Sequence, residues 1–188
     1  MLEKDKNEKR VERHDETQED FTPIGIVNAM LDQFPKEAFT NMSKTIIDYS
    51  AGNGNFLVEA LDRKLDNSKN VDDAVEALKA IYGVELMADN VEECRERLYA
   101  LVISRYPKVK TTPEYNYKVR NIIKNRIQWH DSLKFDYNKW PRIGTQRTGF
   151  VSFKEPKGEC DTKYPMWFKD ESCKELTLFT DADFDSLA

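Results

Sequence analysis

Residues 46–61, IIDYSAGNGNFLVEAL, are compatible with few folds. They begin with apolar residues and an acid, pass through a turn containing Gly52 and Gly54, and end with apolar residues at helical spacing. Because glycine has no Cβ, such a turn can adopt a positive φ and lets the backbone approach a ligand closely. We therefore predict a buried strand, a bare turn and a helix in direct succession, the start of a βαβ unit.

The alternation of strand and helix continues along the chain. The predicted elements are a helix over residues 23–34, strands over 44–50, 81–86 and 125–133, and helices over 54–65, 70–81 and 88–106. Strands that alternate with helices indicate a parallel sheet and the α/β class.

Composition divides the chain into three parts. Residues 1–20 are almost all charged or polar, so we expect a mobile or solvated arm. Residues 21–136 carry the α/β pattern, which fails in residues 137–188. For this last part we expect an irregular extension that packs on the same domain, adds one or two strands from residues 148–153 and 175–180, and ends in an acidic tail.

Composition also excludes several classes of protein. The chain has 188 residues, a formal net charge of −5 and 34% charged residues, and no apolar run approaches the length of about 20 residues that spans a bilayer. The first residues offer no secretion signal, so we expect a cytoplasmic protein without a membrane partner. The three scattered cysteines argue against a disulfide framework, and the two distant histidines give no zinc spacing, so no metal is expected.

An acid lies at the end of each predicted strand. Asp48 ends the first strand, Glu85 the second and Asp131 the third. Because parallel strands end at one edge of the sheet, where α/β proteins bind ligands, these acids should share an edge with the glycine turn. An acid at the end of the second strand is typical of sites that hold ribose hydroxyls, so the pattern predicts a nucleoside site.

Two residues indicate which nucleoside. A dinucleotide fold carries a third glycine three residues after the second, but Leu57 occupies that place. The charge of Asp48 would repel a pyrophosphate. A nucleoside with a cationic amino-acid tail, S-adenosylmethionine, fits better; an α/β fold without a ligand is the competing interpretation.

Four motifs in this order resemble the amino-methylating DNA adenine methyltransferases. They are FTP at 21–23, DYSAGNGNF at 48–56, GVEL at 83–86 and HDSL at 130–133. The resemblance covers about residues 17–136 and is greatest to the methylation subunits of restriction–modification systems, short phage-encoded versions in particular. It implies a Rossmann-like methyltransferase fold, here apparently truncated, that binds S-adenosylmethionine.

The resemblance implies a role for each motif. The FTP segment would line the methionine end of the cofactor, Asp48 and the glycine turn would hold the amino-acid and ribose portions, and Glu85 would bind the ribose hydroxyls. Asp131 would accept a hydrogen bond from the adenine amine. The residues implied to line the cofactor are Phe21, Thr22, Pro23, Asp48, Ser50, Gly52, Gly54, Asn55, Phe56, Glu85, Leu86, Asp131, Ser132 and Leu133.

The chain departs from the family in two places. Tyr49 stands where the family usually has proline. The family's catalytic tetrapeptide, Asp or Asn, then Pro-Pro, then an aromatic residue, is not found, because the chain contains no Pro-Pro pair. The nearest segment, NKWPR at 138–142, has these residue types in another order, so no catalytic residue is assigned.

Three functions therefore remain open. The resemblance implies DNA adenine amine methylation. The missing tetrapeptide favours a non-catalytic accessory, regulatory or antirestriction protein on the same fold, one that works with a partner subunit. A third possibility is methylation of another substrate with a rebuilt loop over residues 137–168, in which Trp140, Tyr164 and Trp167 form a stacking wall.

One basic stretch is a candidate DNA contact. Residues 105–126 contain seven basic residues, one acid and interleaved tyrosines, a mixture that suits phosphates and stacked bases. A solvated helix surface explains the same composition and is the more common outcome.

Overall fold

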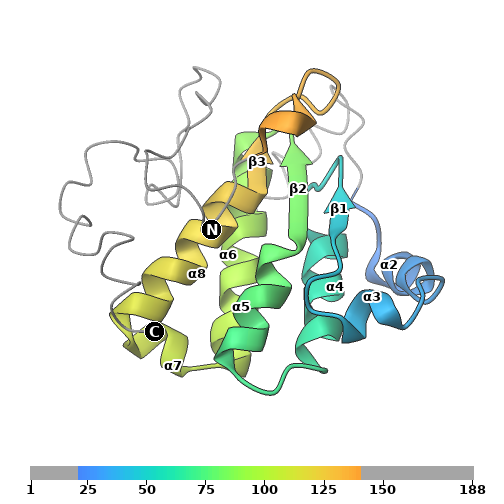
Figure 1. The fold of residues 1–188 in the computed structure, drawn as a ribbon. Coiled ribbons are helices and arrows are strands. Elements are labelled where there is room, and N and C mark those ends of the chain that lie inside the picture. The colour runs from blue at the N-terminus through green and yellow to red at the C-terminus, as the bar shows by residue number, and fades with distance from the viewer. Residues whose placement is uncertain (1–20, 141–188) are drawn as a thin grey trace, which may run out of the picture.

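A computed structural model describes residues 21–140, which form a three-stranded sheet covered by helices (Figure 1). The strands are β1 (Ile46–Asp48), β2 (Ile81–Glu85) and β3 (Ile127–Trp129), in the spatial order β1-β2-β3. Both pairs are parallel, with Asp48 opposite Gly83 and Glu85 opposite Trp129. For this part of the chain the predicted α/β class and parallel sheet are confirmed.

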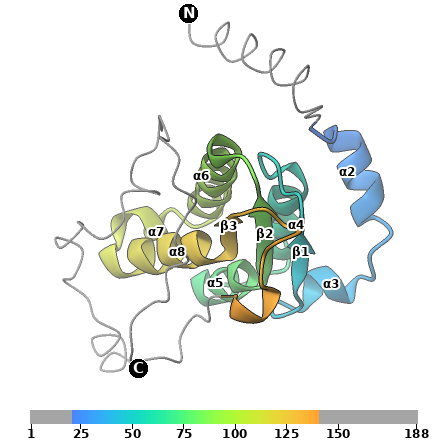
Figure 2. The same ribbon diagram turned by 90° about the horizontal axis from the view of Figure 1, so that it is seen from above.

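Helices cover both faces of the sheet. They are α2 (Ile24–Leu31), α3 (Glu37–Thr40), α4 (Asn55–Leu65), α5 (Val71–Lys79), α6 (Ala88–Arg105), α7 (Lys108–Thr111) and α8 (Pro113–Arg126), followed by the 3₁₀ turn η1 (Tyr137–Lys139). Seen from above, α4 and α6 lie on one face and α5 on the other, while α8 runs beside β3 and α2 lies beyond β1 (Figure 2). Within residues 21–140, no helix combines the length and apolarity needed to cross a membrane.

The predicted elements differ from the structure at their ends, and three helices of the structure, α3, α7 and α8, were not predicted. The strand predicted over residues 44–50 is only three residues long. The longest of these, α8, has buried residues at helical spacing, Val119, Ile122 and Ile123, but charged and amide residues dominate the segment and give it a weak apolar pattern. The strands expected at 148–153 and 175–180 lie outside the described residues.

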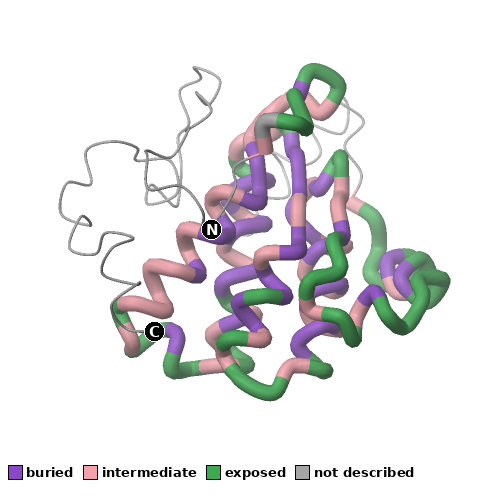
Figure 3. Tube along the Cα trace, in the orientation of Figure 1, coloured by how far each residue is buried: buried purple, intermediate pink, exposed green. Residues whose placement is uncertain are grey.

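Close packing between α4 and β2 depends on one glycine. A Cβ on Gly83 would lie 2.7 Å from Leu57 Cδ1 and 3.1 Å from Ala51 Cβ. Leu57 of α4 therefore fills the space that Gly83 leaves on β2. A dinucleotide fold has its third glycine at the position of Leu57. Figure 3 shows this buried layer running along β2 and the helices behind it.

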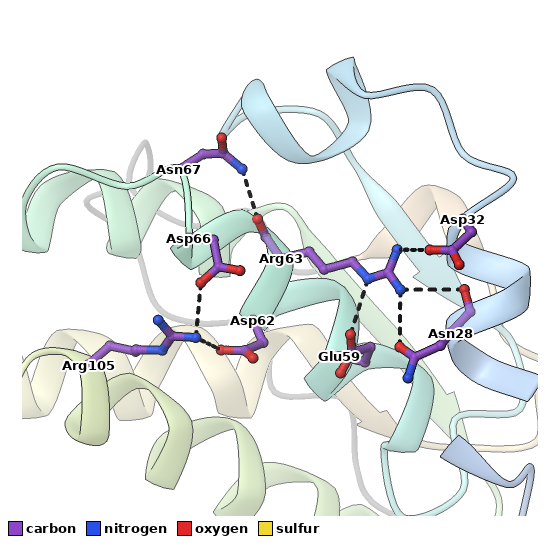
Figure 4. A network of polar contacts seen from close by, with 8 residues as sticks. All are labelled: Asn28, Asp32, Glu59, Asp62, Arg63, Asp66, Asn67 and Arg105. Atoms are coloured by element: carbon purple, nitrogen blue, oxygen red, sulfur yellow. Dashed lines mark hydrogen bonds and ion pairs between the residues drawn. The ribbon is translucent and has the colours of Figure 1, made fainter. Parts of the chain in front are cut away.

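Helix α2 is held on the body of the domain by Arg63 of α4 (Figure 4). The guanidinium lies 2.7 Å from Asp32 Oδ1 and 3.1 Å from Glu59 Oε1, and donates to the side-chain oxygen of Asn28 at 3.0 Å. Its charge also lies 5.6 Å from the centre of the Phe39 ring. These contacts fix α2 on α4, and the FTP motif lies directly before α2.

Lys64 is a fully buried cation at the end of α4. Its side chain is 0% exposed, and Nζ donates to the carbonyl oxygens of Asn41 and Met42 at 2.8 and 3.3 Å. Burial disfavours the ammonium and lowers the pKa of Lys64 to about 8. The lysine thus holds the loop before β1, but the burial of its charge lowers the stability of the fold.

Lys64 should make stability depend on alkaline pH. Between the folded pKa of about 8 and the ordinary value of 10.5, the unfolded chain binds more protons than the folded one, so stability rises with pH. The unfolding free energy of the wild type, minus that of Lys64→Met, should increase by roughly 2–3 kcal/mol from pH 8 to 10.5. Urea unfolding of both proteins at several pH values measures this difference; a difference that does not change with pH would contradict it.

Candidate functional site

The carboxyl edge of the sheet collects the acids that the sequence singled out. Asp48 ends β1 and Glu85 ends β2, while Asp131 follows two residues after the end of β3. The His130 amide donates to the Glu85 carbonyl oxygen at 2.9 Å, so the second and third strand exits remain joined beyond the ladder. We call this edge, with the turn at residues 51–54, the strand-end site.

Glu85 binds two backbone amides. Its Oε2 accepts a hydrogen bond from the Gly52 amide at 2.8 Å, and its Oε1 accepts one from the Met87 amide, also at 2.8 Å. The residue is 7% exposed. A carboxylate has about four acceptor positions, so two remain for ligand hydroxyls. Glu85 therefore fixes the glycine turn and keeps the capacity to bind a ribose.

The two glycines of the turn have different neighbours. Gly52 has φ +52°, and a Cβ there would lie 3.3 Å from Phe21 Cδ1, so the first FTP residue lies against the turn. Gly54 has φ +88° and is buried, and a Cβ there would lie 2.6 Å from Cys94 Sγ on α6. Gly52 is the glycine at the strand-end site, whereas Gly54 makes room for α6.

The start of α4 has unused donors. Among the hydrogen bonds of residues 21–140, none is donated by the backbone amides of Asn55 or Phe56. The Asn55 side chain donates to the Thr22 carbonyl oxygen at 2.9 Å and accepts from Arg97 at 2.8 Å. Free amides at a helix N-terminus favour an anionic group, such as the carboxylate of an amino acid.

Asp48 lies partly buried at the end of β1. Burial raises the pKa of its carboxyl group above the usual 3.8, and a hydrogen bond from the Ser50 amide at 3.0 Å only partly opposes this shift. The carboxylate is thus less well stabilised than in water. A cationic ligand group beside it would compensate.

Replacing this acid should stabilise the protein without ligand. Between pH 3.8 and the raised folded pKa, the folded state binds more protons than the unfolded state, so Asp48 lowers stability as pH rises. Asp48→Asn keeps an oxygen for the Ser50 amide and should unfold at a higher urea concentration than the wild type at pH 7, but not at pH 3. The matched control is Asp72→Asn in the first turn of α5, where loss of charge should slightly reduce stability. A less stable Asp48→Asn at pH 7 would contradict the prediction.

Asp131 already has partners. Its Oδ2 lies 2.8 Å from Lys134 Nζ and its Oδ1 accepts from the Leu133 amide at 3.0 Å. The hydrogen bond from Lys134 is the main reason that the pKa of Asp131 is lowered. Two apolar residues implied to line the cofactor, Leu86 and Leu133, are 60% and 94% exposed.

Two groups near the strand-end site were not predicted. Asn53 is buried in the turn, where its amide donates to Glu93 at 3.1 Å while its Oδ1 has no hydrogen-bond partner. An aromatic cluster lies at the same edge: Tyr49, Tyr82, His130, Phe135, Tyr137 and Trp140. The frequent aromatic residues in 129–140 could have indicated the cluster. Nothing in the sequence indicated that the Asn53 side-chain oxygen would be buried without a hydrogen-bond partner.

Part of the basic stretch 105–126 is engaged in contacts within the fold. Its arginines have partners there: Arg105 pairs with Asp62 and Asp66, Arg120 with Glu96, and Arg126 donates to the Lys79 carbonyl oxygen. Tyr115 donates to Asp72 at 3.4 Å. These contacts hold part of the stretch against the neighbouring helices, while contact with DNA stays a prediction.

Comparison with known proteins gives no match to a family model, a curated protein or a solved structure. Within residues 21–140, no group of three or more His, Cys, Asp or Glu side chains is arranged to hold a metal ion. The chemistry of the site is therefore inferred from its own residues: an amide-bound acid, a partly buried acid, a bare glycine and free helix amides.

Proposed function

We propose that this chain binds S-adenosylmethionine at the strand-end site and is a methyltransferase-like protein of Rossmann type, with the adenine amine of DNA as the implied methyl acceptor. The observation that carries the proposal is the meeting of three distant segments at one turn. Phe21 lies against Gly52, Asn55 donates to Thr22, and Glu85 accepts from the Gly52 amide. The three strands in the order β1-β2-β3 are compatible with half of such a sheet.

The residues of the site fit the chemical groups of this cofactor. The two remaining acceptor positions of Glu85 suit the ribose hydroxyls, and the free amides of Asn55 and Phe56 suit the methionine carboxylate. The partly buried Asp48 would gain from the cofactor's ammonium group. Bound there, the cofactor would supply an electrophilic methyl group on a sulfonium, and the protein would contribute mainly positioning.

A second function is favoured by the missing tetrapeptide. Without a Pro-Pro pair anywhere in the chain, no residue is assigned to hold the target amine. A non-catalytic accessory or antirestriction protein would keep the strand-end site and act through a partner subunit.

Calorimetry with S-adenosylmethionine and its demethylated product tests the shared part of both functions. We expect saturable binding by the wild type and loss of binding in Asp48→Ala, with Asp66→Ala on the far end of α4 as the matched control. Absence of binding heat at high protein concentration would refute both functions.

Transfer of a tritiated methyl group to unmethylated DNA separates the two. Incorporation that is lost in Asp48→Ala supports catalysis. Cofactor binding without incorporation supports the accessory function.

A further inference from the structure

Two tyrosine rings lie at the end of β1, on the other side of that strand end from Asp48. Asp48 and Tyr49 are consecutive, so their side chains leave the strand end in different directions. Asp48 is close enough to Cys94 of α6 to affect its pKa, whereas the Tyr49 ring contacts the Tyr137 ring at 5.3 Å between centroids. The acid and the aromatic pair therefore flank one strand end.

The aromatic pair is held in place from behind. The Tyr137 hydroxyl donates to the Ser132 carbonyl oxygen at 2.8 Å, and its ring contacts Phe135 at 5.0 Å between centroids. Trp140 supports both rings of this layer, at 4.9 Å from Phe135 and 6.0 Å from Tyr137, and its indole N–H donates to Asn125 at 3.1 Å. A surface fixed in this way loses little entropy when a ligand binds to it.

The front of the pair is open. Tyr49 is 55% exposed and Tyr137 is 38% exposed, and the two rings meet edge to face at 87°. An edge-to-face contact leaves ring surface uncovered, which is the surface that a flat ring stacks on. Asp131 directly precedes Ser132, which accepts from Tyr137; beside its contacts with Lys134 and the Leu133 amide, its carboxylate has acceptor positions for an exocyclic amine.

We propose that Tyr49 and Tyr137 form a stacking surface for an unpaired nucleobase, held beside the strand-end site. The inference rests on the proposed function, because it places the acceptor base next to the methyl donor. It also explains Tyr49, which stands where the resembling enzymes have proline.

Fluorescence of 2-aminopurine tests the inference directly, because stacking quenches its emission. A short single-stranded DNA with one 2-aminopurine should lose emission when it binds the wild type together with the demethylated cofactor. Tyr49→Leu should weaken this binding about tenfold or more, whereas Tyr49→Phe and Tyr137→Phe should bind within about twofold of the wild type. Free 2-aminopurine nucleoside, measured in parallel, distinguishes a base within a strand from a free nucleoside.

Tyr115→Leu is the matched control, because Tyr115 lies on α8 in the basic stretch. Binding that is lost in Tyr115→Leu and retained in Tyr49→Leu would overturn the inference, as would unchanged emission at saturation. Tyr49→Trp gives a second readout that keeps an aromatic ring: its added indole emission should fall when unlabelled DNA binds. Cofactor calorimetry distinguishes the stacking surface from the proposed function. Quenching of 2-aminopurine without any binding of the cofactor would refute only the proposed function.

Discussion

Replacing Glu85 by alanine is expected to abolish cofactor binding and to remove about 2–5 kcal/mol of stability at the same time. The carboxylate accepts the Gly52 and Met87 amides and is 7% exposed, so its loss leaves two donors without an acceptor in a nearly dry place. Each unsatisfied buried donor costs on the order of 1–3 kcal/mol. If Glu85 were an exposed acid that only contacts the cofactor, its replacement would weaken binding without lowering stability.

Glu85→Gln separates the two roles. Glutamine has the same length and keeps one acceptor oxygen, but its NH₂ group faces the second amide, so about 1–3 kcal/mol of stability should be lost. Cofactor affinity should fall by at least tenfold, because the ribose hydroxyls lose a charged acceptor. Urea unfolding measures the first effect and calorimetry the second.

The matched control for both variants is Glu76→Gln, an exposed acid of α5 paired with Lys79. It should change stability by less than about 0.5 kcal/mol and leave binding unchanged. An alanine variant as stable as the wild type would show that the two amides do not depend on Glu85. Unchanged affinity in Glu85→Gln would remove this acid from the cofactor site.

The positions of the acids could be predicted because they follow from strand direction. Parallel strands deliver their last residues to one edge, so Asp48 and Glu85 needed only a correct strand assignment. The double role of Glu85 could not be predicted, because it depends on a contact across 33 residues between a turn and a strand end. The same holds for Phe21, whose contact with Gly52 joins segments 31 residues apart and depends on how the chain before α2 lies on the turn.

The glycines stand out in the sequence, but the sequence does not show which neighbour each of them accommodates. Gly52, Gly54 and Gly83 each leave room for a neighbouring side chain. From the sequence, the first two were predicted to make room for a ligand, and no role was predicted for Gly83. Gly83 accommodates Leu57 and Gly54 accommodates Cys94. Which partner each glycine accommodates depends on how α4 and α6 pack on the sheet, and this information is not local.

Gly54→Ala should therefore be much more harmful than Gly52→Ala, although both glycines have positive φ. At each position alanine suffers backbone strain of about 1–3 kcal/mol. At Gly52 the new methyl group meets, among residues 21–140, only the Phe21 ring at 3.3 Å, in a half-exposed segment that can shift. At Gly54 it would lie 2.6 Å from Cys94 Sγ and 3.3 Å from Cys94 Cα, so α6 itself must move. We expect a loss of about 3–5 kcal/mol for Gly54→Ala and about 1–2 kcal/mol for Gly52→Ala, measured by urea unfolding.

Truncating the neighbour isolates the steric part of this loss. Cys94 is fully buried, and burial raises its pKa to about 12, so it packs as a neutral thiol and Cys94→Ala alone should cost about 1 kcal/mol. In Gly54→Ala/Cys94→Ala the sulfur is gone while the Cβ at 3.1 Å remains, so the double variant should be more stable than the sum of single effects predicts, by about 1–2 kcal/mol. Strictly additive losses would mean that backbone strain alone requires glycine at this position. The contact with α6 would then have no part in shaping the turn that carries the strand-end site.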